Sequence, residues 1–239
     1  MPRFFTQEVD ETGARITGAD AAHIARVLRM RPGEKLTVCD LAGSDYLCEI
    51  VSAAPDAVEL RVLEKRPTVA EPGVRVTLFQ GLPKADKMEL IVQKSVELGV
   101  SRIVPVLTAR CVSRPDASAL AKKTARWQKI AFEAAKQSGR GRLPVVDTAV
   151  DFAAAARELA GMERGILFYE KGGDAHRGVW DGAREIGVCI GPEGGFTEEE
   201  VAQAAGLGVR VCTLGPRILR TETAPLCVLS IIMYATGNL

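Results

Sequence analysis

Residues 186–200 read IGVCIGPEGGFTEEE, an apolar run followed by a glycine-rich loop and a helix-like segment. Residues 209–224 repeat that order as VRVCTLGPRILRTETA and lead into an apolar run that ends at Tyr234. A β-like run, a loop and then a helix is the repeating unit of parallel α/β sheets, which bind ligands at the carboxyl ends of their strands. We therefore expect the two loops, Gly191–Glu200 and Leu214–Ala224, to border a ligand pocket.

The composition of the two loops supports this expectation. Gly191, Gly194 and Gly195 would let backbone amides approach a ligand, because glycine has no Cβ to stand in the way. The second loop surrounds the apolar pair Ile218 and Leu219 with charged and hydroxyl residues. The simpler alternative is that each loop is only a strand-to-helix turn, in which a threonine caps the helix and the arginines are solvated.

Alternating strands and helices are predicted from Val74 onward. Residues 74–81 and 101–108 predict two strands, and residues 84–99 predict a helix between them that ends at Gly99. Further elements are predicted as a helix over 115–137, a strand over 143–146, a helix over 151–160 and a strand over 166–169. This alternation predicts an α/β fold with a parallel sheet and helices on both faces.

The first 66 residues have a different pattern. β-like runs at 36–40, 46–52 and 58–64 and a short helix signal at 20–28 predict a small β-rich domain. The segment that follows, KRPTVAEPG, contains two prolines and a glycine and is typical of a linker. We therefore expect a β-rich domain over residues 1–66, a linker over 67–73 and an α/β domain over 74–239.

The overall composition excludes several classes of protein. The chain has 239 residues, of which 47% are hydrophobic and 26% are charged, as in ordinary globular proteins. No apolar run approaches the roughly 18 residues of a membrane span, and the N-terminus lacks the apolar core of a signal peptide. Six scattered cysteines and two histidines show no metal-ligand spacing, so the cysteines are interpreted as buried hydrophobes. We expect a cytoplasmic protein without a metal site.

The net charge of +1 conceals a basic middle segment. Residues 74–146 carry 14 lysines and arginines against 5 acidic residues. The densest part lies within residues 122–142 and ends in SGRGR, a flexible basic turn where a phosphate backbone could dock. A basic segment in an otherwise neutral chain favours binding to a polyanion such as RNA. The alternative is a solvated helix face.

Taken together, five motifs resemble the RsmE family closely and over nearly the whole chain. They are the two loops and, in addition, PRFF at residues 2–5, QKSVELGV at 93–100 and KQSGR at 136–140. RsmE proteins methylate ring nitrogen N3 of a uridine in 16S ribosomal RNA of the small subunit. Two positions depart from the family pattern: Lys136 stands where an acid is usual, and Pro225 stands where alanine is common.

This resemblance implies the fold and the partners. The C-terminal part would be a SPOUT α/β knot, in which a deep trefoil knot forms the S-adenosylmethionine site and two subunits of a homodimer complete the active unit. The N-terminal part would be a PUA-like β-barrel that helps to hold RNA. The resemblance also implies that the cofactor pocket is formed by residues 167–173, 191–195 and 214–223.

The candidate site residues fall into three sets. The candidate catalytic residues are Arg220, Glu222 and Glu193. The candidate cofactor-binding residues are Leu167, Tyr169, Gly191, Pro192, Glu193, Gly194, Leu214, Gly215, Ile218, Leu219 and Thr223. The candidate RNA-binding residues are Arg3, Lys84, Lys122, Lys123, Arg126, Lys136, Arg140 and Arg142.

The chemistry of uracil explains the catalytic set. N3 must lose a weakly acidic proton, and Arg220 could hydrogen-bond the carbonyl oxygens that then carry the negative charge. Glu222 or Glu193 could accept the proton if burial raised its pKa toward the working pH. In the alternative interpretation, Arg220 forms a salt bridge with Glu222, and the glutamates orient the arginine or cap a helix. N3 lies on the Watson–Crick edge, so the target base must be unpaired or flipped out.

Two other functions remain open at this point. One is a SPOUT enzyme that methylates a ribose hydroxyl, although the RILRTETA loop and the PRFF start speak against it. The other is an RNA-binding assembly factor that has lost catalysis. Binding of S-adenosylmethionine and transfer of its methyl group distinguish an active enzyme from an assembly factor.

Overall fold

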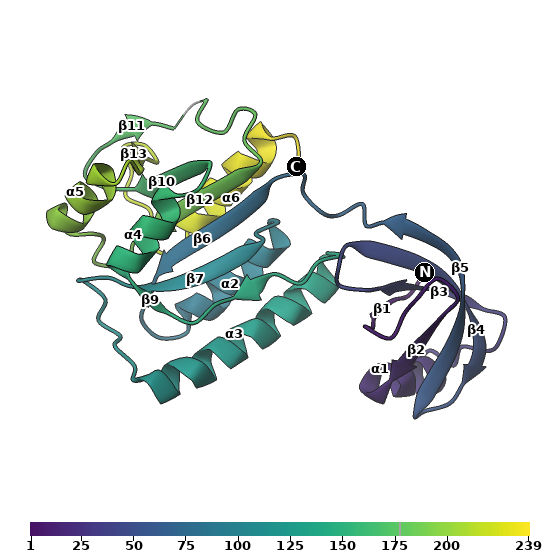
Figure 1. The fold of residues 1–239 in the computed structure, drawn as a ribbon. Helices are drawn as coiled ribbons and strands as arrows, with labels where there is room; N and C mark the ends of the chain where they lie inside the picture. The colour runs from purple at the N-terminus through teal and green to yellow at the C-terminus, as the bar shows by residue number, and fades with distance from the viewer. Residues whose placement is uncertain (177) are drawn as a thin grey trace. The chain divides into compact units, whose positions relative to one another are not determined.

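The computed structural model describes residues 1–176 and 178–239, which form two compact units (Figure 1). The N-terminal unit contains Met1–Glu71 and Ala135–Leu143, and the C-terminal unit contains Pro72–Ala134 and Pro144–Leu239. Residues 135–143 therefore pack with the N-terminal unit, although they include the end of a helix that begins in the other unit. Local sequence pattern does not reveal this return of the chain, because the helical periodicity simply continues.

The N-terminal unit is a five-stranded sheet in the order β1-β3-β4-β5-β2. Its strands are β1 (Arg3–Phe5), β2 (Gly13–Thr17), β3 (Lys35–Cys39), β4 (Ser44–Ala53) and β5 (Ala57–Pro67). Strands β1 and β3 are parallel, and the other neighbours are antiparallel. The three strands predicted from sequence are confirmed as β3, β4 and β5. Strand β1 has only three residues and therefore little pattern of its own, whereas β2, which is as long as β3, was not predicted.

Alternation of apolar and polar residues places the core of this unit on one face of the sheet. Ile16, Leu36 and Val58 are buried there and pack against Ile24. The predicted helix over 20–28 is a short helix α1 (Gly18–Ala22) that continues as one π-helical turn, η1 (His23–Val27). Thr68 and Glu71 from the predicted linker also belong to this unit, since the Thr68 amide donates to the carbonyl of Gly43 at 2.9 Å.

The C-terminal unit is built on an eight-stranded sheet in which every described pair of strands is parallel. Its strands are β6 (Arg75–Gly81), β7 (Arg102–Leu107), β8 (Val145–Val146), β9 (Val150–Asp151), β10 (Arg164–Phe168), β11 (Asp174–Ala175), β12 (Glu185–Ile190) and β13 (Arg210–Thr213). The order is β11-β13-β10-β12-β6-β7-β8, and β9 pairs with β7. The predicted parallel sheet is confirmed.

Helices cover both faces of this sheet, as predicted (Figure 1). They are α2 (Lys87–Glu97), α3 (Ala117–Gln137), α4 (Phe152–Ala160), α5 (Glu198–Gly206) and α6 (Ala224–Ala235). Helix α4 packs with α5 on one face, and α2 packs with α6 on the other. The buried side of α2 carries the residues that helical spacing predicted, including Met88, Ile91, Val92 and Val96. None of the described helices is long and apolar enough to cross a membrane.

Local capping explains where two helices begin. Asp151 precedes α4, and its side chain accepts a hydrogen bond from the Ala154 amide at 2.7 Å. Helix α5 starts with a capping box, in which Thr197 accepts from the Glu200 amide and Glu200 accepts from the Thr197 amide. Glu200, the last residue of GPEGGFTEEE, therefore helps to begin helix α5.

Strand order brings the two candidate loops together. Strand β10 lies between β12 and β13 and is parallel to both, so the carboxyl ends of the three strands share one edge of the sheet. The loops that follow these strands begin after Phe168, Ile190 and Thr213. Three neighbouring loops therefore lie at the edge of the sheet where the sequence predicts a ligand pocket.

Candidate active site

A cavity of about 370 Å³ opens at this edge of the sheet, a size typical of small-ligand sites. It is lined by residues from all three loops and by one residue of helix α2. The lining residues are Lys87, Phe168, Tyr169, Glu170, Ile190, Gly191, Pro192, Glu193, Gly194, Gly195, Thr213, Leu214, Gly215, Arg217, Ile218, Leu219, Arg220, Thr221 and Ala224. The lining combines apolar side chains and backbone with charged groups, which suits a ligand that has both an apolar and a charged part.

Glycine is required in this region because backbone segments pack closely. A Cβ on Gly81 would lie 2.5 Å from Cδ of Pro192 and 2.6 Å from its nitrogen. Gly195 has a φ of +66°, and a Cβ there would lie 2.4 Å from Glu170 Oε1. The reason predicted from sequence for the loop glycines is close approach of the backbone to a ligand. The structure adds a second reason, which is the packing of the loop against β6 and against residue 170.

A buried hydrogen-bond chain ties the second loop to the centre of the sheet. Gln80 at the end of β6 donates through Nε2 to Thr221 Oγ1 at 3.1 Å, and Thr221 donates to the carbonyl of Gly191 at 2.8 Å. Both side chains are buried. The chain leaving β13 therefore passes the end of β12 and reaches β6 before α6 begins. Sequence reasoning did not identify Gln80 or this role for Thr221.

A second set of contacts anchors the first loop to the segment after β7. Glu200 Oε1 accepts from the Ala109 amide at 2.7 Å, and Arg110 donates through Nη1 to the carbonyl of Gly194 at 3.0 Å. Glu200 is buried, and both of its carboxylate oxygens accept hydrogen bonds from backbone amides. These contacts hold this wall of the cavity in place and engage the carbonyl of Gly194, one of its lining residues.

The charged side of the cavity is organised by a lysine that sequence analysis missed. Lys87, the first residue of α2, places its ammonium 3.2 Å from Glu193 Oε1 and 3.0 Å from Glu222 Oε2. Glu193 also accepts from the Lys84 amide at 3.2 Å. Lysine side chains are mostly exposed on protein surfaces, so the sequence offered no signal for this role. Only the fold brings it to the two glutamates.

The pKa values of both glutamates are lowered. Burial alone would raise the pKa of Glu193, but hydrogen bonds from its own amide, the Lys84 amide and Lys87 outweigh burial. The hydrogen bond from Lys87 is the largest influence on Glu222 and lowers its pKa against a smaller effect of burial. In turn, Glu222 first and Glu193 second raise the pKa of Lys87. Raised glutamate pKa values, which the sequence analysis required of a good base, are therefore not found.

Arg220 lies on the cavity wall and is exposed. Among the described residues its guanidinium has no ion-pair partner, and Glu222 pairs with Lys87 instead. The alternative Arg220–Glu222 salt bridge is therefore absent from this arrangement. The Arg220 carbonyl accepts hydrogen bonds from the Thr223 and Ala224 amides, which anchors the backbone while leaving the side chain available.

Most candidate cofactor-binding residues line the cavity, and two do not. Those in the lining are Tyr169, Gly191, Pro192, Glu193, Gly194, Leu214, Gly215, Ile218 and Leu219. Leu167 is fully buried within β10, and Thr223 precedes α6 without a side-chain capping bond. Pro225 occupies the first turn of α6, where a missing amide costs little. The Tyr169 hydroxyl is buried and has no hydrogen-bond partner among the described residues, so a ligand could satisfy it.

The candidate RNA-binding residues of the C-terminal unit lie on or near its surface. Lys84, Lys122 and Arg126 are exposed, and Lys123 is half-buried. Arg126 pairs with Glu89 at 2.8 Å. No ion pair with a described residue engages the side chains of Lys84, Lys122 and Lys123. These three lysines are therefore available to phosphates without breaking an existing ion pair.

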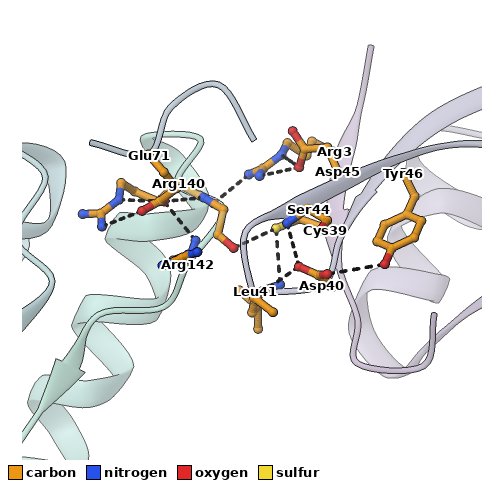
Figure 2. A network of polar contacts seen from close by, with 12 residues as sticks. Arg3, Cys39, Asp40, Leu41, Ser44, Asp45, Tyr46, Glu71, Arg140 and Arg142 are labelled. Carbon is orange, nitrogen blue, oxygen red and sulfur yellow. Dashed lines mark hydrogen bonds and ion pairs between the residues drawn. The ribbon is translucent and has the colours of Figure 1, made fainter. Parts of the chain in front are cut away.

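The candidates of the N-terminal unit are mostly engaged in internal contacts (Figure 2). Arg140 is buried and pairs with Glu71, with its Nε 3.0 Å from Oε1, so it is not the surface cation that the sequence suggested. Arg3 pairs with Asp45 at 2.8 Å and donates to the carbonyl of Arg140. In the same unit, the Lys136 ammonium lies 2.9 Å from Asp20. Arg142 is exposed.

The interpretation of the cysteines is confirmed. All six are free thiols, five of them are buried, and Cys227 is half-buried. Burial raises the pKa of Cys48 to about 11, so this thiol stays protonated and unreactive at neutral pH. In the part of the chain that the structure describes, no group of three or more His, Cys, Asp or Glu side chains could hold a metal ion.

Comparison with protein families places both units in one class. Residues 70–233 match the model of an RNA methyltransferase domain, and residues 16–63 match that of an RNA methyltransferase PUA domain. A parallel sheet with a small-ligand cavity at its carboxyl edge, next to a small β-rich unit, is thus the architecture of an RNA methyltransferase. This agrees with the fold class and the activity predicted from sequence.

Individual relatives define the family more narrowly. The chain is 36% identical over 249 residues to ribosomal RNA small subunit methyltransferase E of Bacillus subtilis, covering 99% of this chain and 97% of the relative. The protein of the same name from Mycobacterium tuberculosis is 32% identical, covering 98% and 92%. The chain belongs to the ribosomal RNA small subunit methyltransferase E family, as its motifs suggested.

A solved structure supports the same assignment. The Neisseria gonorrhoeae ribosomal RNA small subunit methyltransferase E, bound to S-adenosyl methionine, is 33% identical. It superposes with a TM-score of 0.83 and covers 98% of this chain and 97% of its own. Full coverage on both sides indicates that the two-unit architecture is shared throughout.

Proposed function

We propose that this protein transfers the methyl group of S-adenosylmethionine to N3 of a uridine in 16S ribosomal RNA of the small subunit. The observation that carries this proposal is the cavity at the carboxyl edge of the sheet, lined by the three loops from β10, β12 and β13 and by the free guanidinium of Arg220. Membership of the ribosomal RNA small subunit methyltransferase E family and the cofactor-bound relative support the substrate and the methyl donor.

The residues of the cavity fit S-adenosylmethionine. Ile190, Leu214 and Leu219 offer apolar contact for an adenine ring, and the unpartnered Tyr169 hydroxyl offers a polar one. The glycines of Gly191–Gly195 place no Cβ between the loop backbone and a ligand, although the Gly191 and Gly194 carbonyls already accept hydrogen bonds from Thr221 and Arg110. Glu170 lines the cavity and has no ion-pair partner among the described residues, so its carboxylate suits a cationic ligand. When bound, the cofactor would supply an electrophilic methyl group, and the task of the protein is to hold the uracil in near-attack geometry.

The charged residues handle the proton and the negative charge of the base. Uracil N3 must give up its proton, and the resulting charge resides on the neighbouring carbonyl oxygens. Arg220 is the proposed donor to those oxygens, because it borders the cavity and its guanidinium has no ion-pair partner in the part of the chain that the structure describes. Glu222 and Glu193 are the proposed proton acceptors. Since their pKa values are lowered, proton loss depends on nearby cations that stabilise the uracil anion as well as on the carboxylates.

Recognition of RNA is assigned to charged surfaces outside the cavity. Lys84, Lys122 and Lys123 would contact phosphates, while the base is selected inside the cavity. The PUA match supports an RNA-holding role for the N-terminal unit. Homodimer formation, the trefoil knot and the cytoplasmic location stay predictions from the resemblance and the composition. The contact of Thr221 with Gln80, beneath the loop of Gly191, is compatible with a knotted path.

The decisive experiment is methyl transfer to a defined substrate. Purified protein is incubated with labelled S-adenosylmethionine and small ribosomal subunits from cells that lack this gene. We expect label in 16S ribosomal RNA, located at uridine N3 by mass spectrometry of nucleosides. Label on a ribose hydroxyl would instead indicate the alternative enzyme class. Tight RNA binding without any transfer would favour the assembly-factor interpretation.

A further inference from the structure

Lys87 joins three segments that are distant in sequence. It is the first residue of α2, Glu193 lies in the loop after β12, and Glu222 lies just before α6. One ammonium group contacts both carboxylates, at 3.2 Å and 3.0 Å. The three side chains are each between about one fifth and one third exposed, so water screens the ion pairs only in part.

Two carboxylates that share one ammonium group must lie close to each other. In the absence of the cation, two neighbouring carboxylates cannot both ionise without cost, and one of them takes up a proton at unusually high pH. Lys87 supplies the positive charge that removes this cost. Its position therefore determines the protonation and the geometry of Glu193, which lines the cavity, and of Glu222, which lies outside the lining between Thr221 and Ala224.

We propose that Lys87 is a positioning residue of the methyl-transfer site, whose ammonium holds Glu193 and Glu222 together as a pair of anions and so joins the loop after β12 to the loop before α6. The effect that we infer for Lys87 on the rate of methyl transfer rests on the proposed function. Its structural consequence, the charge state of the two glutamates, does not depend on which RNA is methylated.

The other charged groups near this pair are few. Lys84 contributes its backbone amide to Glu193, and Arg220 acts on Glu222 through its charge. Glu170 and Arg217 line the same cavity, but no ion pair connects either of them to Lys87 or to the two glutamates within the described residues. Lys87 is thus the cation in direct contact with both carboxylates, and its removal leaves neither with an ion-pair partner among those residues.

The test is a titration of the two carboxyl groups by NMR, with carbon-13 in the glutamate side chains and assignment by Glu193→Gln and Glu222→Gln. In the unmodified protein we expect both groups to titrate below the ordinary value of 4.5. In Lys87→Met, one of them should titrate higher by about one pH unit or more, because the like charges are no longer balanced. Lys87→Arg should restore the low values, and adding Glu222→Gln to Lys87→Met should abolish the raised one.

Lys94→Met is the matched control, because Lys94 is in the same helix but pairs with Glu97. It should change neither titration. If Lys87→Met does not fold, Glu222→Gln with nitrogen-15 detection of the Lys87 ammonium provides a second measurement. There the raised pKa of Lys87 should move back toward 10.5. Unchanged titration of both glutamates in Lys87→Met, or of Lys87 in Glu222→Gln, would overturn the proposal.

Kinetics separate this inference from the proposed function. In Lys87→Met we expect kcat for methyl transfer to fall roughly tenfold or more, with the acid limb of its pH profile moved to higher pH. A normal acid limb together with normal kcat would overturn the positioning role. If the titrations behave as expected while the unmodified protein transfers no methyl group, the positioning of the glutamates stands and the proposed function fails.

Discussion

At the scale of single residues, neighbours rather than residue type decide what the charged groups can do. Glu193 and Glu222 were expected to need raised pKa values, yet backbone amides together with Lys87 lower the pKa of Glu193, and Lys87 lowers the pKa of Glu222. Arg140 was expected to meet RNA, yet it is buried against Glu71. In both cases the side chain carries the expected charge, but the group that it pairs with lies far away in sequence.

Arg220 offers the most direct test of the catalytic assignment. Arg220→Ala should lower turnover roughly a hundredfold or more, because a preorganised donor to the uracil anion is lost. Affinity for S-adenosylmethionine, measured by calorimetry, should stay within a few fold. Arg220→Lys keeps the charge without the planar fork and should recover only part of the rate. A collapse of cofactor affinity would instead place Arg220 among the cofactor-binding groups.

Glu71 should make the N-terminal unit sensitive to acid. Burial would raise the pKa of Glu71, but Arg140 and the amides of Arg142 and Gly141 outweigh burial and lower it (Figure 2). A carboxylate with a lowered folded pKa stabilises the protein above its unfolded pKa and loses that effect as pH falls through the folded value. The contribution is therefore complete at neutral pH and is lost below the ordinary value of 4.5.

The corresponding variant is Glu71→Gln. It should destabilise the protein by about 3 kcal/mol at pH 7, since it leaves the buried Arg140 without a counter-charge. The difference in unfolding free energy from the unmodified protein, measured by urea denaturation, should shrink on acidification. Glu49→Gln removes an exposed pair with Arg61 and should cost less than about 1 kcal/mol. Equal effects of the two variants would contradict the structural role of Glu71.

At the scale of elements, the strands and helices with strong patterns were predictable. The helix around Met88 and Ile91 and the strands that flank it were confirmed, because hydrophobic periodicity and a terminal glycine act locally. Strand β8 falls within the strand predicted over 143–146, whereas the two-residue strands β9 and β11 depend on pairing with partners elsewhere in the sheet. A segment that short has no periodicity of its own.

Glycines inside elements provide a matched pair of predictions. Gly165→Ala in β10 would put a Cβ 2.1 Å from the carbonyl oxygen of Leu159, so it should cost about 1–3 kcal/mol of stability. Gly206→Ala at the end of α5 meets nothing within 4 Å and should stabilise by about 0.5–1 kcal/mol. Thermal unfolding of both variants measures the contrast. Destabilisation by Gly206→Ala would show that the end of α5 is packed differently.

At the scale of the whole molecule, affinity for RNA should depend on salt through the lysines of the C-terminal unit. Replacing both Lys122 and Lys123 by alanine should weaken RNA binding and lower the slope of log K against log salt by about one to two. Affinity for S-adenosylmethionine should not change. Arg75→Ala, an exposed cation of the C-terminal unit that pairs with Glu185, is the control and should leave the slope unaltered. An unchanged slope in the double variant would remove these lysines from the RNA surface.

The sequence by itself determined the fold class, the family and the loops that line the cavity, because these depend on periodicity and on contiguous motifs. The strand-loop-helix pattern alone predicts Gly191–Gly195 and Leu214–Arg220 at the carboxyl edge of the sheet, where they line the cavity. Only the tertiary structure decided how the charged residues are paired. The ammonium of Lys87 between two glutamates, like the contact of Gln80 with Thr221, joins residues more than 100 positions apart. Local patterns carry no information about such pairs, because strand order and loop packing create them.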